Sequence, residues 1–315
     1  MSLSRLSPNQ TGVEPDIADG GVATVRLQGS GVELTADVRG PEDGPPVLLL
    51  HGGGQTRHAW SNTATELANE GWRAVALDLR GHGDSDWPEN GDYDPEHFAA
   101  DLQAVAGQMG EPPAVVGASL GGMMTLASMR IAGKQLYSEV VLVDIAPRME
   151  PDGVERIIKF MLGYPDGFAT LTDAADAIAA YRPNKPRPSD LNGLKRTLRR
   201  APDGRWHWRW DVRFLTSKFQ SDGNGIERLG ASRQAMEESL LAGARRIEVP
   251  TLLVRGEESD VVSREGADAL LDAVPHAQCI DINDAVHMVS GDQNDAFTRS
   301  VVEFLARSFQ QRMKR

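Results

Sequence analysis

Cysteine is almost absent from this chain, since Cys279 is the only one among 315 residues. A framework of intrachain disulfides is therefore excluded, and such scarcity is typical of a reducing compartment. Long apolar runs are also missing: no stretch of about 18 apolar residues occurs, and no apolar signal segment follows Met1. The sequence predicts neither a membrane span nor export through a signal peptide, and we expect a cytoplasmic protein.

Basic residues are too few to balance the acidic ones. Lysine and arginine number 33 against 45 aspartates and glutamates, which leaves a net charge of −12 at neutral pH. This charge repels nucleic acid and anionic membrane surfaces, so neither is expected as a partner. Hydrophobic residues make up 40% of the chain, which is enough at this length for one large core with an insertion.

Compact metal and phosphate motifs are missing as well. His51, His58 and His82 match no spacing of the His-Glu-x-x-His kind, and no cysteine cluster accompanies them. The glycines at 52–54 lack the Lys-Ser/Thr pair with which a phosphate loop holds phosphate and Mg²⁺. We therefore expect no metal and no cofactor.

Apolar strands alternate with helical segments along most of the chain. Residues 22–27 and 32–38 predict a hairpin pair, which follows a polar segment over 1–20 that we expect to be a loose tail. The other predicted strands are apolar runs over residues 47–50, 73–78, 114–118, 139–144, 250–255 and 278–282. The predicted helices cover residues 58–70, 95–109, 120–133, 264–273 and 293–312. This alternation indicates an α/β fold, with a mostly parallel sheet of eight strands and helices on both faces.

A nucleophile motif lies between one of these strands and the next helix. The segment Gly117-Ala-Ser-Leu-Gly121 fits the Gly-x-Ser-x-Gly nucleophile elbow. A turn sharp enough to lift the Ser119 hydroxyl above a sheet crowds its neighbours, and glycine at positions 117 and 121 removes the clash. Ser119 could instead be an ordinary helix cap, but the strand before it and the helix after it favour the nucleophile.

A serine nucleophile needs a histidine to take its proton and a carboxylate to orient that histidine. In hydrolases built around an elbow, the order along the chain is serine, acid, histidine. Asp260 lies in the loop after strand 250–255, and His287 follows strand 278–282. Asp144, at the end of strand 139–144, is an alternative acid. Three further carboxylates lie close to Asp260 in the sequence: Glu257, Glu258 and Asp281.

Acyl transfer also needs N–H donors that stabilise the negative charge on the carbonyl oxygen, typically by about 2.7–4 kcal/mol each. The strand over 47–50 runs into His51-Gly-Gly-Gly54, where bare glycine backbone can approach a substrate. We expect the N–H groups of Gly53 and Leu120 to form the oxyanion hole, with Gly54 as a substitute for Gly53.

Taken together, these motifs resemble the α/β-hydrolase fold superfamily over nearly the whole chain. The resemblance is to its capped serine hydrolases, which include carboxylesterases, lactonases, carbon–carbon bond hydrolases and cofactor-free perhydrolases. The matching elements, in chain order, are His51–Gly54, Asp78–Ser85, the elbow at Ser119, Val141–Pro147, the loop of Asp260 and His287. Haloalkane dehalogenases and epoxide hydrolases have aspartate at the position of Ser119, so their chemistry is not expected here.

The resemblance also implies how the chain is divided. The α/β-hydrolase core is expected over residues 21–147 and 245–315, with a mainly helical cap over 148–244 inserted after the sixth core strand. By the same resemblance, the residues of Asp78–Ser85 brace the oxyanion loop and take no part in the chemistry.

Tryptophan is concentrated in one part of the predicted cap. Trp206, Trp208 and Trp210 alternate along the chain, so an extended backbone would place all three on one side. They could roof an apolar acyl pocket or anchor the cap to the core, and we favour the anchor. Four residues that border the catalytic motifs are expected as pocket walls: Trp60, Trp87, Val262 and Met288.

The expected reaction is cleavage of a small or medium hydrophobic carboxylic ester or lactone. It would proceed through an acyl-enzyme on a triad of Ser119, Asp260 and His287. Carbon–carbon bond hydrolysis and perhydrolysis use the same triad and stay open as alternatives. The alternative of another class is a noncatalytic small-molecule receptor on a retained hydrolase fold. The sequence also leaves a homodimer open.

Overall fold

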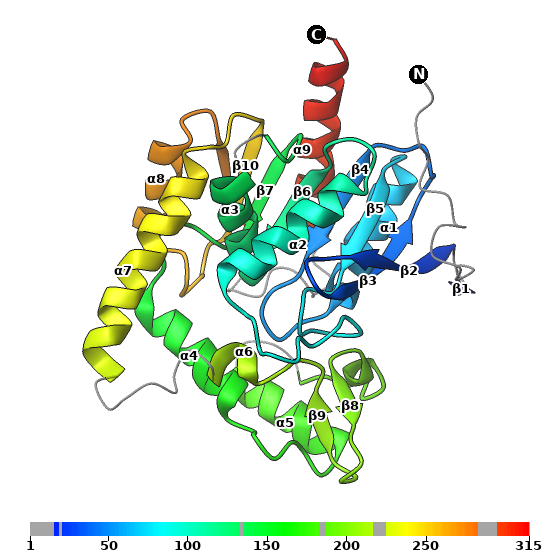
Figure 1. Cartoon of the computed structure of the whole chain (residues 1–315), viewed down its shortest axis with the longest axis vertical. Helices are drawn as coiled ribbons and strands as arrows, with labels where there is room; N and C mark the ends of the chain where they lie inside the picture. Colours follow the sequence, from blue (N-terminus) through cyan, green and yellow to red (C-terminus); the bar gives the residue numbers. More distant parts are fainter. Residues whose placement is uncertain are drawn as a thin grey trace.

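The computed structural model describes residues 16–18, 21–132, 135–182, 187–216, 225–282 and 295–314 (Figure 1). Its main sheet has nine strands in the spatial order β1-β2-β3-β5-β4-β6-β7-β10-β11. These strands are β1 (Asp16–Ala18), β2 (Val22–Gln28), β3 (Glu33–Arg39), β4 (Pro46–Leu50), β5 (Arg73–Leu77), β6 (Ala114–Ala118), β7 (Val140–Val143), β10 (Thr251–Gly256) and β11 (Gln278–Ile282). Neighbours from β5 to β11 pair in parallel, whereas β1, β2 and β3 pair antiparallel.

Helices cover both faces of this sheet. They are α1 (Ser61–Asn69), α2 (Pro95–Gly107), α3 (Leu120–Ala132), α8 (Arg264–Ala273) and α9 (Asp295–Met313). In β4, Leu48 and Leu50 belong to an apolar cluster with residues of α2, α3 and α8. Val47 and Leu49 of the same strand belong to a second cluster, with residues of α1 and α9. Because both faces are covered, each central strand reads as a continuous apolar run.

The sheet agrees with the sequence in its main features. All eight expected strands are present, and the mostly parallel sheet with helices on both faces is confirmed. The ninth strand, β1, lies within the segment 1–20 that was expected to be a loose tail, and it pairs Ala18 with Val22. The predicted helix over 58–70 is divided into a 3-10 turn, η2 (Arg57–Trp60), and α1.

The segment between β7 and β10, residues 148–244, is here called the insert. It contains α4 (Pro151–Leu162), α5 (Leu171–Tyr181), η3 (Gly193–Arg196), β8 (Leu198–Arg200), β9 (Trp206–Trp208), α6 (Arg213–Thr216) and α7 (Gly225–Ala244). In Figure 1, α4, α5, α6 and the β8–β9 pair form a layer below the sheet, whereas α7 runs up beside α3. Within the described ranges, no helix has the length and apolar content needed to cross a membrane. The insert's standing as a separate cap domain stays a prediction.

Candidate active site

The elbow residue Ser119 lies between β6 and α3 and has a left-handed backbone, with φ at 44°. Few residues other than glycine adopt this conformation, which costs roughly 1–3 kcal/mol and must be held by its surroundings. The Ser119 N–H donates to the carbonyl of Val143 in β7 at 3.1 Å, and its carbonyl accepts from the N–H of Met123 at 2.9 Å. These two bonds tie the strained residue to the neighbouring strand and to the first turn of α3.

The two glycines of the elbow have the role expected from the sequence. A Cβ atom on Gly117 would lie 2.7 Å from the carbonyl carbon of Gly121, which is too close for any side chain. A Cβ on Gly121 would lie 2.4 Å from the carbonyl oxygen of Leu50, at the end of β4. Glycine therefore permits both the sharp turn and the close approach of α3 to β4.

The glycine-rich loop after β4 lies beside the elbow. A Cβ on Gly52 would be 3.5 Å from the Cβ of Ser119, and the N–H of Gly121 donates to the carbonyl of His51 at 3.1 Å. The N–H of Gly54 donates to His82 Nε2 at 3.3 Å, so it is already bonded. For the N–H of Gly53, the described part of the chain supplies no acceptor.

Leu120 is the second residue expected at the oxyanion hole. It is the first residue of α3, where the N–H has no acceptor within its own helix. A Cβ on Gly53 would lie 4.0 Å from the Cβ of Leu120, so the two expected donors belong to neighbouring pieces of backbone. This arrangement is compatible with two N–H groups aimed at one carbonyl oxygen.

Two buried, uncharged histidines support this loop. Burial lowers the pKa of His51 to about 4 and that of His82 to about 3. His51 accepts from the N–H of Leu79 at 3.0 Å through Nε2 and donates to the carbonyl of Gly52 at 2.8 Å through Nδ1. His82 donates through Nδ1 to the carbonyl of Arg80 at 3.0 Å. Each ring therefore forms hydrogen bonds to backbone groups through both of its nitrogens. The bonds of His82 agree with the bracing role expected for residues 78–85.

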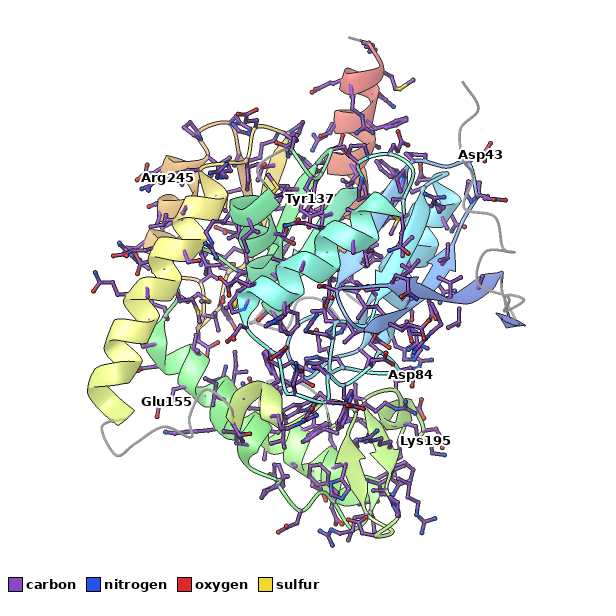
Figure 2. The ribbon with its side chains drawn as sticks, in the orientation of Figure 1. Asp43, Asp84, Tyr137, Glu155, Lys195 and Arg245 are labelled. Carbon is purple, nitrogen blue, oxygen red and sulfur yellow. The ribbon has the colours of Figure 1, made fainter. Side chains whose placement is uncertain are left out.

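A network of ion pairs is centred on Arg57, which follows the glycine-rich loop after β4. Arg57 forms ion pairs with Asp78, with Asp37 at 2.9 Å and with Asp84 at 2.8 Å. Asp84 also binds Arg209 of the insert at 2.7 Å. Figure 2 shows Asp84 at the level where the sheet layer meets the insert, which is where a carboxylate can bridge the two.

Of the two main candidates for the acid, Asp144 is the more buried. It follows β7 with φ at 47°, and only 2% of its surface is exposed. Val143 pairs with Ala118 in the sheet, so Asp144 follows β7 at the same level at which Ser119 follows β6. Its carboxylate accepts from the Ser259 hydroxyl at 2.8 Å and from the Gly256 N–H at 3.2 Å.

Asp260, the acid expected from the sequence, lies in the loop after β10. It forms an ion pair with Arg156 of α4, with Nε at 2.8 Å from Oδ2, and its side chain is 39% exposed. Its other oxygen, Oδ1, is buried and has no hydrogen-bond partner among the described residues. Among the neighbouring carboxylates, Asp281 pairs with Arg255 at 2.8 Å, which lowers the pKa of Asp281.

The remaining expected site residues are less closely grouped. His287 and Met288 lie outside the described residues. Trp60 is fully buried in the cluster between the sheet, α1 and α9, where its ring lies 6.0 Å from that of Phe297. Trp87 is half-buried under the guanidinium of Arg199. Val262 is buried in the loop after β10, two residues beyond Asp260.

The three tryptophans of the insert differ in what they contact. Trp206 and Trp208 pack with Phe168 inside the insert, and Trp208 also packs against the cluster on the core side. Trp210 forms a β-bridge with His82 and belongs to the cluster on the core side. On either side of this bridge, Gly83 N–H donates to Arg209 at 2.7 Å and Asp211 N–H donates to Gly81 at 2.8 Å. The favoured anchoring role therefore fits Trp210, at the turn that braces the oxyanion loop.

Two residues of α4 near the candidate site were not predicted from the sequence. Arg156 pairs with Asp260, and Met161 places its thioether against the oxyanion loop: its Cε would lie 3.3 Å from a Cβ on Gly54. Both depend on how the insert folds back over the sheet, which has no local signal. Among the described residues, no cluster of histidine, cysteine or carboxylate side chains could hold a metal ion.

Comparison with known proteins places this arrangement in a family. The family model described as alpha/beta hydrolase family matches residues 47–299. Esterase Rv0045c of Mycobacterium tuberculosis is 29% identical over 265 residues, which cover 82% of this chain and 81% of that protein. A solved structure of the same esterase has a TM-score of 0.69 at 27% identity and covers 95% of this chain and 96% of that one.

A second relative has a more specific name. The 3-hydroxybutyrate-oligomer hydrolase of Cupriavidus necator is 27% identical over 77% of this chain and 83% of its own length. The solved structure of an E-2-(acetamidomethylene)succinate hydrolase has a TM-score of 0.73 at 20% identity, covers 90% of this chain and 99% of that one, and shows the fold alone. The expected α/β-hydrolase fold is confirmed, and the chain belongs to the alpha/beta hydrolase family.

Proposed function

We propose that this protein is a serine hydrolase that cleaves a small or medium hydrophobic carboxylic ester or lactone. The observation that carries the proposal is Ser119, held at φ 44° between β6 and α3, beside the glycine-rich loop after β4. A strained serine at this point of an α/β sheet is the arrangement of a nucleophile elbow. Relatives named as an esterase and as an oligomer hydrolase support an ester bond as the target.

The proposed reaction has two steps. Ser119 Oγ attacks the carbonyl carbon while His287 takes the hydroxyl proton, and the N–H groups of Gly53 and Leu120 stabilise the oxyanion. The bond to the alcohol then breaks, and His287 gives the proton to the leaving oxygen. Water, deprotonated by His287, attacks the acyl-enzyme and releases the acid, and the proton returns to Ser119. Gly53 is preferred to Gly54 as a donor because the Gly54 N–H is bonded to His82.

Two carboxylates compete for orienting His287. Asp260 is the proposed acid because it lies in the loop after β10, and its buried Oδ1, which has no partner among the described residues, is available to a histidine N–H. Asp144 is favoured by its burial and by its position level with Ser119 on the adjacent strand. Arg156 already neutralises Asp260, whereas hydroxyl and amide donors hold the carboxylate of Asp144.

The variants D260N and D144N separate the two candidates. Replacing the acid of a triad by its amide leaves the fold intact and lowers kcat by about 10⁴-fold through the wrong histidine tautomer. We expect a loss of this size in one variant only, measured on a p-nitrophenyl ester after circular dichroism has shown that both are folded. A loss below about tenfold in both would mean that neither side chain is the acid.

The proposal as a whole is tested on wild type and S119A. We expect the wild type to hydrolyse p-nitrophenyl esters or lactones and to gain one fluorophosphonate adduct on Ser119, located by mass spectrometry. S119A should lose both the adduct and the turnover. Folded wild type that gives neither would contradict the proposal and favour a noncatalytic receptor.

Carbon–carbon bond hydrolysis and perhydrolysis would use the same residues, and each can be distinguished from ester hydrolysis by its substrate. A vinylogous diketone tests carbon–carbon bond hydrolysis, and peroxide with acetate tests perhydrolysis. Turnover of either at a rate well above that of the ester panel would replace the ester as the proposed substrate. A homodimer stays a prediction, which sedimentation velocity would test.

A further inference from the structure

Helix α4 crosses the candidate site from one side to the other. At its start, the N–H of Glu150 donates to the carbonyl of Val261 at 2.9 Å. A Cβ on Gly153 would lie only 2.0 Å from the carbonyl oxygen of Asp260, so the helix backbone rests directly on the loop after β10. The ion pair between Arg156 and Asp260 adds a third link. This end of α4 is fixed to the loop that carries one of the two candidate acids.

The other end of α4 lies over the oxyanion loop. The Cε and Sδ atoms of Met161 would each be 3.8 Å from a Cβ on Gly53, and the Cε would be 3.3 Å from one on Gly54. Trp210 Nε1 would be 3.8 Å from the same Cβ on Gly54. Met161 itself is 9% exposed. Its thioether therefore occupies space next to an expected oxyanion donor.

Between these two ends, α4 turns an apolar face toward the core. Val154, Ile157 and Met161 follow the i, i+3, i+7 spacing of a single helix face. All three belong to, or pack against, the apolar cluster on the core side of the insert. A group held beside Ser119 and the oxyanion donors would meet this face, and Met161 is its member nearest the oxyanion loop.

We infer that Met161 sets the size of the acyl group that the enzyme accepts, and that the preferred acyl group is short and apolar. The inference rests on the proposed function. The acyl group stays on Ser119 through both steps with its carbonyl oxygen at the oxyanion hole, whereas the alcohol leaves after the first. A side chain packed on the oxyanion loop therefore limits the acyl side, and its apolar character excludes charged acyl groups next to the carbonyl.

Methionine suits such a boundary because it is flexible and fills irregular space. Truncation to alanine removes the thioether and opens volume beside Gly53, whereas phenylalanine fills more of it. The two substitutions should therefore move the chain-length preference in opposite directions, which a general loss of stability would not do.

The test measures kcat/KM for p-nitrophenyl acetate, butyrate and hexanoate. Relative to wild type, M161A should raise the ratio of hexanoate to acetate by about tenfold or more, and M161F should lower it by a similar factor. The matched control is M129A, because Met129 is also a buried methionine, 2% exposed, but lies in the last turn of α3. It should lower stability and leave the ratio unchanged.

Three outcomes overturn the inference. The first is an unchanged ratio in both Met161 variants, and the second is the same shift in M129A. The third is a change only in a series that varies the alcohol of an acetate ester, which would place Met161 on the leaving-group side. Failure of the proposed function looks different, because the wild type would then hydrolyse no ester in the panel.

Discussion

At the scale of single residues, His51 and His82 couple the stability of the protein to pH. Each ring accepts a backbone N–H through one nitrogen and donates through the other, so neither can take a proton without losing a bond. Burial lowers the pKa of His51 to about 4 and that of His82 to about 3, whereas an unfolded histidine titrates near 6.5. Below about pH 6.5 the unfolded chain therefore binds protons that the folded chain does not.

We expect the free energy of unfolding to fall as the pH is lowered from 7 to 4. Each histidine contributes a slope of up to about 1.4 kcal/mol per pH unit between the unfolded and folded pKa values. H82Q should reduce the pH dependence of the free energy of unfolding by the contribution of one histidine. Urea denaturation across the pH range measures this. Equal slopes in wild type and H82Q would show that His82 is not buried uncharged.

The sequence predicts the role of a single residue when the reason for that role lies in the neighbouring residues. The clashes at Gly117 and Gly121 arise within one turn and beside one strand, so the motif alone indicates them. Contacts between side chains of distant elements cannot be predicted in this way. The loop after a late strand favours Asp260 as the acid, but the ion pair of Asp260 with Arg156 and the burial of Asp144 depend on the completed fold.

At the scale of elements, the contact between α4 and the loop after β10 requires glycine at position 153. A methyl group there would meet the carbonyl oxygen of Asp260 at 2.0 Å, so the helix would have to move away from the loop. G153A should therefore lower kcat/KM for short esters by about tenfold, because displaced catalytic groups act poorly, and lower stability by about 1–3 kcal/mol.

The matched control for this variant is G107A at the end of α2. A Cβ on Gly107 meets no atom within 4 Å, so alanine should stabilise that helix by up to about 1 kcal/mol and leave activity unchanged. Steady-state kinetics and thermal unfolding of both variants provide the comparison. Wild-type kinetics in G153A would mean that α4 does not position the site.

Strands are the elements that the sequence predicts best. In β4, Val47 and Leu49 are buried on one face of the sheet and Leu48 and Leu50 on the other. The apolar run is therefore continuous and indicates a strand that is covered on both faces. The short edge strand β1 lies in a polar segment and has no comparable signal. The position of α4 over the site cannot be predicted from the sequence either. Its amphipathic pattern indicates a buried face but not what that face covers.

At the scale of the whole molecule, Asp84 joins the insert to the core through Arg209 on one side and Arg57 on the other. Asp84 is 45% exposed at its side chain, so its share in total stability should be below about 1 kcal/mol. Its local effect should be clearer, because the neighbouring backbone bond from the Gly83 N–H to the Arg209 carbonyl joins the core to the insert.

We expect D84A to raise hydrogen exchange over residues 204–212 by up to about fivefold without changing exchange in the central strands. Mass spectrometry of peptides from both regions measures this. D43A is the control, because Figure 2 shows Asp43 far from the contact between insert and core. Unchanged exchange over 204–212 in D84A would show that the ion pairs of Asp84 do not hold this part of the insert.

The turn around His82 has one more consequence. On one side, this residue is bridged to Trp210 of the insert, and on the other its ring holds the N–H of Gly54. Displacing Trp210 would therefore also loosen the support of the oxyanion loop. A substitution in the insert can thus disturb the oxyanion loop while leaving the elbow residues themselves unchanged.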